Sequence, residues 1–292
     1  MPDTDPPGDA PGKTILDERE EELSLLQIDE KNALYYEYDP PSGAGGKTFV
    51  FINPITGDCS LWQGLIGPAL RKAGHGTLVY NFRGQAKSSF DPAIALDDKL
   101  ITADLMRVIA ELKIDAPIVV GLSIGGLYAI RAHAQGLKPS GIVLVNTLRK
   151  MSPRIDWMNR MCVRLMQQGG PTLLRDVASH VITSEAMHAA MIDDIFDNPS
   201  AYEGLAEDAG FMNLVTHMAD TSWEMDLTGL DLPVLVTTGY QDRVFYNPAD
   251  VDALFAELPQ GLRLDIPQAG HMIPAERPKE FILALMGFAD IL

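Results

Sequence analysis

The sequence predicts an α/β fold in which helices flank a mostly parallel central sheet and a further helical segment is inserted between two strands. The first observation behind this prediction is an alternation of short apolar runs, typical of buried strands, with longer runs of helical periodicity. The second is the octapeptide Val-Val-Gly-Leu-Ser-Ile-Gly-Gly at 119–126, where a buried strand passes through a glycine-flanked serine into a helix. The third is a stretch from about 148 to 225 that contains no strand-like run.

The strands are expected in a regular order along the chain. Two antiparallel strands come first, at 23–28 and 33–38, because apolar and polar residues roughly alternate on either side of a turn. The strands that follow are short apolar runs, which suit a parallel sheet buried on both faces. These runs lie at 48–52, 77–80, 116–120 and 141–145, and two later ones lie at 262–267 and at 233–242, where the strand runs out into a loop.

Helices are expected between these strands. Apolar residues recur every three or four positions after about Ser60 and again around Leu105–Leu112, and a continuous helix is expected at 126–134. The inserted stretch also predicts several helices. The breaks between them are expected at Pro153, at 169–171, at 198–199 and at Gly210.

Ser123 is the candidate nucleophile. It lies between Gly121 and Gly125 in a Gly-x-Ser-x-Gly motif, and a side chain at either glycine would collide with the neighbouring strand or helix. The turn would hold the serine hydroxyl at the top of the sheet, above a helix N-terminus that stabilises negative charge. Because the motif alone is common, a serine in an ordinary tight turn is the alternative. The buried strand before Ser123 and the unbroken helix after it favour the nucleophile.

Two later residues complete a candidate catalytic triad. Asp242 follows an apolar strand, and His271 lies in a loop between a strand and the last helix. All three residues are therefore expected at the carboxyl edge of the sheet. The imidazole would take the serine proton, and the carboxylate would fix the imidazole tautomer. Asp231 and Asp265 are rival acids, but the first precedes its strand and the second lies inside a strand pattern.

From about Leu23 onward the chain resembles the α/β-hydrolase superfamily, whose catalytic residues follow the order serine, acid, histidine. Three further stretches carry the resemblance. Residues 48–62 are similar to the third strand of the superfamily and its following loop. Residues 78–88 are similar to a strand followed by an Asp-x-Arg-Gly-x-Gly-x-Ser turn, and residues 270–278 to the histidine loop and the last helix. The resemblance implies the α/β-hydrolase fold and acyl transfer to water through an acyl-enzyme.

One departure from the superfamily pattern bears on the substrate. Most members have His-Gly where this chain has Asn53-Pro54. Enol-lactone hydrolases similar to 3-oxoadipate enol-lactonase have an asparagine there, followed by an Asp and a Ser-x-Trp at the spacing of Asp58 and Ser60-Leu61-Trp62. This local similarity implies a lactone or a small carboxylic ester as the substrate.

The same departure affects the oxyanion hole. Pro54 has no N–H group and so cannot donate to an oxyanion. The expected donors are the N–H of Ile124, which follows the nucleophile, and the N–H of Ile55. Donors of this kind each contribute about 3 kcal/mol to transition-state stabilisation.

Five residues are candidate substrate contacts: Asn53, Trp62, Arg149, His217 and Trp223. For the asparagine, the alternative is a loop residue that bonds its own backbone. The arginine could pair with a substrate carboxylate or could simply be a surface residue. For the histidine and the second tryptophan, packing between helices is the alternative.

The chain is expected to divide into a tail, a core and a cap. Residues 1–20, rich in Pro, Gly, Asp and Glu, are expected to form a disordered acidic tail. Residues 21–148 and 226–292 would form the α/β-hydrolase core, and residues 149–225 a helical cap, or lid, at the superfamily's usual insertion point. Most of the chain's 13 methionines lie in this insertion. They could line an adaptable apolar pocket or simply pack between helices.

Composition limits the partners. The net charge of −17 over 292 residues argues against nucleic-acid or anionic-membrane binding. The resemblance described above implies a small-molecule ester or lactone as the partner. Cys59 and Cys162 have neither metal-site spacing nor the number needed for a disulfide scaffold. No metal or organic cofactor is implied. The start of the chain lacks the pattern of a signal peptide, and no run reaches the ~20 apolar residues of a membrane helix, so a cytoplasmic location is expected. The oligomeric state is left open between a monomer and a homodimer.

Other functions are compatible with the same three residues. A C–C bond hydrolase, a thioesterase, an acyltransferase or a cofactor-free perhydrolase would use the same triad with a different cap. A non-catalytic ligand-binding receptor is the alternative outside catalysis, although such a protein would have no need of all three residues. Similarity of fold by itself does not choose among these functions.

Overall fold

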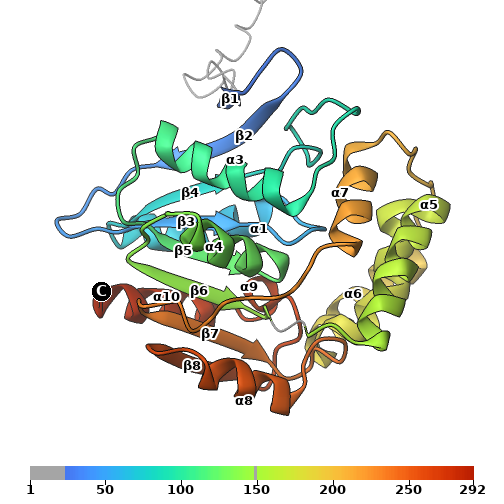
Figure 1. The fold of residues 1–292 in the computed structure, drawn as a ribbon. Coiled ribbons are helices and arrows are strands. Elements are labelled where there is room, and N and C mark those ends of the chain that lie inside the picture. Colours follow the sequence, from blue (N-terminus) through green and yellow to red (C-terminus); the bar gives the residue numbers. More distant parts are fainter. Residues whose placement is uncertain (1–23, 148–149) are drawn as a thin grey trace, which may run out of the picture.

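The computed structural model describes residues 24–147 and 150–292, which form a central sheet with helices on both faces (Figure 1). Within these residues the sheet has eight strands in the order β1-β2-β4-β3-β5-β6-β7-β8. The strands are β1 (Leu25–Gln27), β2 (Ala33–Asp39), β3 (Thr48–Ile52), β4 (Gly76–Tyr80), β5 (Ile118–Leu122), β6 (Gly141–Val145), β7 (Val234–Gly239) and β8 (Gly261–Ile266).

The helices follow the strands in the predicted alternation. They are α1 (Ser60–Gln63), α2 (Ile66–Lys72), α3 (Asp98–Glu111), α4 (Ile124–Ala134), α5 (Pro153–Ile182), α6 (Glu185–Asp197), α7 (Gly210–Ala219), α8 (Pro248–Ala256), α9 (Ile273–Glu276) and α10 (Pro278–Asp290). The pairs β1–β2 and β2–β4 are antiparallel, and the remaining pairs are parallel. The predicted α/β fold with a mostly parallel sheet is therefore confirmed.

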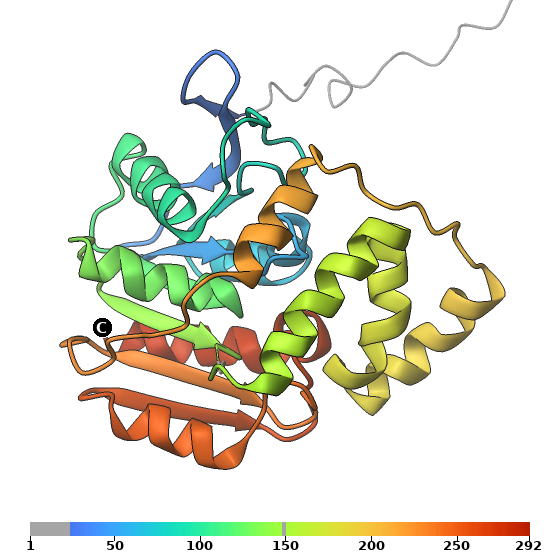
Figure 2. The ribbon, with the colours of Figure 1, turned by 45° about the vertical axis from the view of Figure 1, so that its right-hand side comes forward.

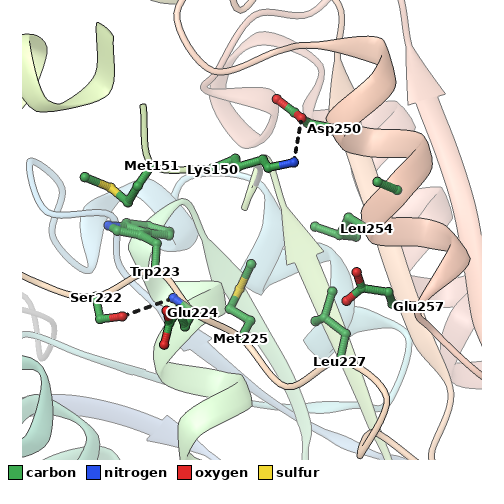
Figure 3. Close-up of a pocket in the computed structure, with 11 residues that line it drawn as sticks. Lys150, Met151, Ser222, Trp223, Glu224, Met225, Leu227, Asp250, Leu254 and Glu257 are labelled. Carbon is green, nitrogen blue, oxygen red and sulfur yellow. Dashed lines mark hydrogen bonds and ion pairs between the residues drawn. The ribbon is translucent and has the colours of Figure 1, made fainter. Parts of the chain in front are cut away.

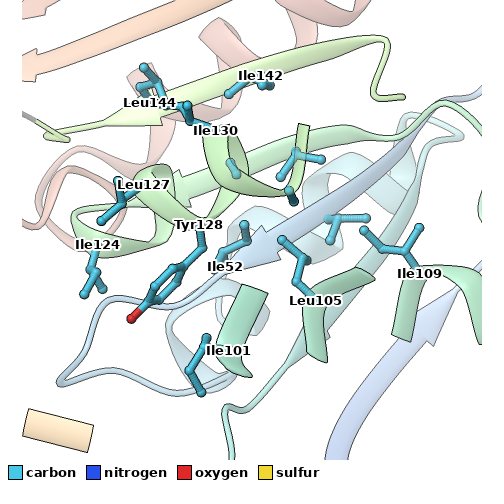
Figure 4. Close-up of a cluster of buried hydrophobic side chains, with 14 of the residues drawn as sticks. Ile52, Ile101, Leu105, Ile109, Ile124, Leu127, Tyr128, Ile130, Ile142 and Leu144 are labelled. Carbon is cyan, nitrogen blue, oxygen red and sulfur yellow. The ribbon is translucent and has the colours of Figure 1, made fainter. Parts of the chain in front are cut away.

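The central strands are apolar throughout because each one faces a core on both sides. In β3, Val50 and Ile52 pack under α3 and α4, while Phe49 and Phe51 pack on the opposite face. Figure 4 shows the first of these cores, where side chains of α3 and α4 point toward residues of the strands. The second core is formed against α1, α2 and α10.

Helices α5, α6 and α7 form the insertion between β6 and β7, and we call them the inserted helices. They lie beyond the carboxyl ends of these strands (Figure 2). Helix α5 is broken at Gly170, whose φ of 63° is left-handed, directly before Pro171. The expected break at 169–171 is thus a kink between two helical halves, whereas Pro153 and Gly210 begin helices.

The inserted helices have a small apolar core of their own and are attached to the sheet domain through α7. Met166 and Met212 are buried in the small core and Met218 in the main one, so these three methionines pack between helices. The Asn213 side chain accepts the N–H of Leu96 at 2.9 Å and donates to the carbonyl of Ile94 at 2.9 Å. In the part of the chain described here, no helix is both long and apolar enough to span a bilayer.

Candidate active site

Ser123 lies in a strained turn between β5 and α4. Its φ of 56° and ψ of −118° are conformations that a residue with a side chain rarely adopts. The turn is tight: a Cβ added to Gly121 would lie 2.3 Å from the carbonyl carbon of Gly125, and one added to Gly125 would lie 2.6 Å from the carbonyl oxygen of Ile52. The spacing of the two glycines is therefore a steric requirement, as the sequence predicts.

His271 and Asp242 are hydrogen-bonded at the same edge of the sheet. His271 Nδ1 lies 2.6 Å from Asp242 Oδ2, and the aspartate is fully buried. The other carboxylate oxygen accepts the backbone N–H groups of Val244 at 3.2 Å and Phe245 at 3.0 Å. Because a carboxylate oxygen accepts at Nδ1, this nitrogen carries the proton and Nε2 is left as the basic nitrogen.

The ring of His271 is held from one side as well. The Phe245 ring packs against the imidazole with the ring centroids 4.8 Å apart. Since Phe245 also donates its N–H to Asp242, one loop fixes both the carboxylate and the imidazole.

The end of β6 connects Ser123 to the histidine loop. The N–H of Ser123 donates to the carbonyl of Val145 at 2.8 Å, and the Thr147 hydroxyl donates to the carbonyl of Ser123 at 2.9 Å. Between these two contacts lies Asn146, whose Nδ2 donates to the carbonyl oxygens of Gly270 at 2.9 Å and His271 at 2.8 Å. Three consecutive residues therefore bind both the serine turn and the histidine loop.

Asn146 also contacts the start of the loop that carries Asp242. Its Oδ1 accepts the N–H of Gly239 at 2.9 Å, three residues before Asp242. The residue is buried and has a left-handed φ of 46°. Sequence reasoning missed Asn146, although an asparagine directly after an apolar strand, at the sheet edge that collects catalytic groups, was a usable signal.

The loop after β3 is braced by a buried cluster of amides. Asn53 Nδ2 donates to the carbonyl of Tyr80 at 2.9 Å and lies 3.1 Å from both Asn81 Oδ1 and Gln85 Oε1. Trp62 Nε1 donates to Asn53 Oδ1 at 2.8 Å. Asn53 and Trp62 have no exposed surface, so we do not retain these two residues as candidate substrate contacts.

Gln85 orients the peptide that carries the predicted oxyanion donor. Its Nε2 donates to the carbonyl oxygens of Pro54 and Ile55, at 3.3 Å each. Among the described residues no peptide bond is cis, so the N–H of Ile55 points away from the Pro54 carbonyl and from Gln85. Ile124 begins α4, where N–H groups have no partner within the helix.

Three further residues are predicted substrate contacts, and the structure describes two of them, Trp223 and His217. Trp223 is buried and lines a cavity of about 400 Å³ between the segment 222–227 and α8 (Figure 3). None of the three predicted catalytic residues lines this cavity. His217 is half-buried in α7, and Arg149 lies outside the described residues.

Cys59 and the acidic and imidazole side chains of the described residues were candidates for other chemistry. Burial raises the pKa of the Cys59 thiol well above its usual range, so this side chain remains protonated at neutral pH. Over residues 24–147 and 150–292, no three His, Cys, Asp or Glu side chains are gathered as metal ligands would be.

Comparison with known families and structures identifies relatives of the whole fold. The family model described as "Alpha/beta hydrolase family" matches residues 49–285. Among curated proteins, none matches this sequence. Many solved structures do match.

Three of these structures are informative. One is MGS-M2, an alpha/beta hydrolase enzyme from a Medee basin deep-sea metagenome library, with 20% identity, a TM-score of 0.77 and coverage of 91% of this chain and 96% of that one. The esterase EaEST from Exiguobacterium antarcticum has 16% identity, a TM-score of 0.74 and coverage of 91% and 99%. The enol-lactonase from Burkholderia xenovorans LB400 has 19% identity, a TM-score of 0.70 and coverage of 88% and 96%. At such identities the similarity establishes a shared fold and no more.

Proposed function

Because the chain belongs to the alpha/beta hydrolase family, we propose that it is a serine hydrolase that cleaves a small carboxylic ester or lactone. Ser123 is the nucleophile, His271 the general base and Asp242 the acid that orients the base. The observation that carries this proposal is the 2.6 Å contact of His271 Nδ1 with the buried carboxylate of Asp242. Asn146 binds both of these loops, and its neighbours Val145 and Thr147 bind the strained turn of Ser123.

The first half of the reaction transfers the acyl group to the enzyme. His271 Nε2 accepts the proton of the Ser123 hydroxyl while Oγ attacks the carbonyl carbon of the substrate. The tetrahedral intermediate then collapses, the C–O bond to the leaving oxygen breaks, and that oxygen takes the proton from His271. In a lactone the leaving oxygen remains part of the acyl chain.

The second half regenerates the enzyme. His271 accepts a proton from water, which attacks the acyl carbon, and then returns that proton to Ser123 as the ester bond to the enzyme breaks. Asp242 stabilises the imidazolium in both halves. Its hydrogen bonds from Val244 and Phe245 support this role because they hold the carboxylate in place beside His271.

The oxyanion of each tetrahedral intermediate would be held by the N–H groups of Ile124 and Ile55. Two observations support this assignment. Gln85 bonds to the carbonyl oxygens of Pro54 and Ile55 and so orients the Ile55 peptide. Gly125, next to Ile124 at the start of α4, packs closely against the carbonyl of Ile52 at the end of β3, so the two N–H groups belong to adjacent segments. Donors held in this way before substrate binds would meet the condition for strong transition-state stabilisation.

The inserted helices would form the cap over this site. Ile55 supports this role, since its side chain packs against the apolar core of the inserted helices as well as against the main core. A lactone is the favoured substrate within the ester class because the Asn53 and Trp62 pattern resembles enol-lactone hydrolases. Because these two residues form a buried hydrogen bond with each other, we infer that they shape the loop that carries Ile55 and do not contact substrate.

The test is labelling with a fluorophosphonate probe in the wild type and in Ser123→Ala, followed by hydrolysis of p-nitrophenyl esters from acetate to octanoate and of enol-lactones. We expect labelling that depends on Ser123, a preference for short acyl chains and turnover of a lactone. Absence of labelling in the wild type would refute the serine hydrolase and favour a ligand-binding role.

A further inference from the structure

Every N–H group of the histidine loop, residues 270–272, has a defined partner. The N–H groups of Gly270 and Met272 donate to the two carboxylate oxygens of Glu276, each at 2.9 Å. The N–H of His271 itself donates to the carbonyl oxygen of Ile182 at 2.5 Å. A loop with all its N–H groups bound has little freedom to rotate the imidazole that it carries.

Two of these contacts lead to the inserted helices. Residues 181–184 form the corner between α5 and α6, and we call them the α5–α6 corner. The N–H of Ser184 donates to Glu276 Oε2 at 2.8 Å, on the same oxygen that binds Gly270. Glu276 therefore joins the histidine loop to the corner through a single carboxylate.

The corner touches the histidine loop backbone to backbone. A Cβ added to Gly270 would lie 2.5 Å from the carbonyl oxygen of Ile182 and 2.7 Å from the backbone of Thr183. The corner also binds the loop of Asp242, because the N–H of Arg243 donates to the carbonyl of Val181 at 2.9 Å. Both loops of the proposed base and acid thus rest on this one corner.

We propose that Glu276 is a positioning residue for His271 and that, through it, the α5–α6 corner is part of the catalytic apparatus. The proposal rests on the role of His271 as the general base. Only a carboxylate can accept all three N–H groups, because an amide in its place has one acceptor oxygen and would direct its NH₂ group at a donor. Charge-assisted hydrogen bonds of this kind are stronger than neutral ones, so a neutral replacement loosens the loop.

The first test compares Glu276→Gln with Glu280→Gln. Glu280 is an exposed residue of α10, 3.8 Å from Arg277, and its replacement removes the same charge. We expect Glu276→Gln to lower kcat and the rate of fluorophosphonate labelling by on the order of 10- to 100-fold, with little change in KM, as for a small misplacement of a catalytic group. Glu280→Gln should behave as the wild type. In a His271→Ala background, Glu276→Gln should have no further effect.

The second test removes the same contact from the side of the corner. Ser184→Pro deletes the N–H that binds Glu276, and its φ of −78° already suits proline, as does the extended conformation of Thr183 before it. Ser184→Ala is the matched control, because it removes the hydroxyl that caps α6 and keeps the N–H. The proline variant should be slower than the alanine variant, and this difference should largely vanish when Gln replaces Glu276.

A readout that does not need activity separates this proposal from the proposed function. The imidazole proton between His271 Nδ1 and Asp242 should give a downfield proton resonance that His271→Ala abolishes. We expect this resonance to shift or broaden in Glu276→Gln and to stay unchanged in Glu280→Gln. Equal labelling rates and equal resonances in the two variants would overturn the proposal. A wild type that is never labelled, with a resonance that still responds to Glu276→Gln, would refute the hydrolase and leave the positioning role standing.

Discussion

The amide nitrogen of Asn146 lies 2.8 Å from the carbonyl oxygen of His271, although 125 residues separate the two in the chain. The same nitrogen donates to Gly270, and the amide oxygen accepts from Gly239. One buried side chain therefore bonds to both the loop of His271 and the loop of Asp242. This relationship depends on an amide, since it uses a donor and an acceptor at once.

Replacement of Asn146 should show how far the site depends on the donor and the acceptor of its amide. Asn146→Gly keeps the left-handed backbone but leaves three buried groups without their partner, so we expect a loss of about 1–3 kcal/mol in unfolding free energy and a lower kcat. Asn146→Asp should be the less active of the two, because it turns a donor into an acceptor that faces two carbonyl oxygens. Thermal unfolding and ester turnover measure both effects; a fully active Asp variant would contradict this account.

Asp242→Asn should reduce kcat by about four orders of magnitude while the fold is preserved. The asparagine would present an NH₂ group to His271 Nδ1 and so favour the tautomer in which Nε2 is protonated and unable to accept the serine proton. Asp231→Asn provides the control, since Asp231 is a surface partner of Gln260 at 3.2 Å. Burst kinetics with an activated ester would show whether acylation is the step that fails.

Ser123→Gly should stabilise the protein while abolishing catalysis. At a φ of 56°, a residue with a Cβ is strained by about 1 kcal/mol, and glycine relieves this strain. We therefore expect Ser123→Gly to unfold at a higher temperature than Ser123→Ala, with neither variant labelled by the fluorophosphonate. The reverse order of unfolding temperatures would show that the turn is not strained.

Gly125→Ala should destabilise the turn and reduce activity. Its added Cβ would approach the Ile52 carbonyl to 2.6 Å, and overpacking of this kind costs about 1–3 kcal/mol. Gly287→Ala in α10 is the matched control, because nothing lies within 4 Å of its added Cβ and alanine favours a helix. Denaturant unfolding should show a lower unfolding free energy than the wild type for Gly125→Ala and a higher one for Gly287→Ala.

Much of the fold could be predicted from the sequence because its parallel strands must be apolar on both faces. The runs at 48–52 and 141–145 coincide with β3 and β6 residue for residue. Candidate catalytic residues could also be named in advance, since Ser123, Asp242 and His271 each follow a strand. The hydrogen bond between His271 and Asp242 agrees with that shared edge, whereas the contact of Ser123 with His271 stays a prediction.

The supporting contacts could not be predicted, because they join backbone groups to side chains far away in the sequence. Glu276 binds the N–H of Ser184 across 92 residues, and no local pattern announces such a contact. The sequence also could not predict the direction in which each candidate side chain points. Asn53 and Trp62 turn inward to each other, and Trp223 lines a cavity of its own.

The amide cluster behind the oxyanion loop has a consequence for the response of the site to acidity. Asn53, Asn81 and Gln85 hold the loop with neutral groups, and none of them gains or loses a proton over the range in which proteins stay folded. The hydrogen bonds that hold the loop after β3, which carries the proposed donor Ile55, are thus independent of pH. The proposed oxyanion hole is therefore expected to keep its shape when the pH changes.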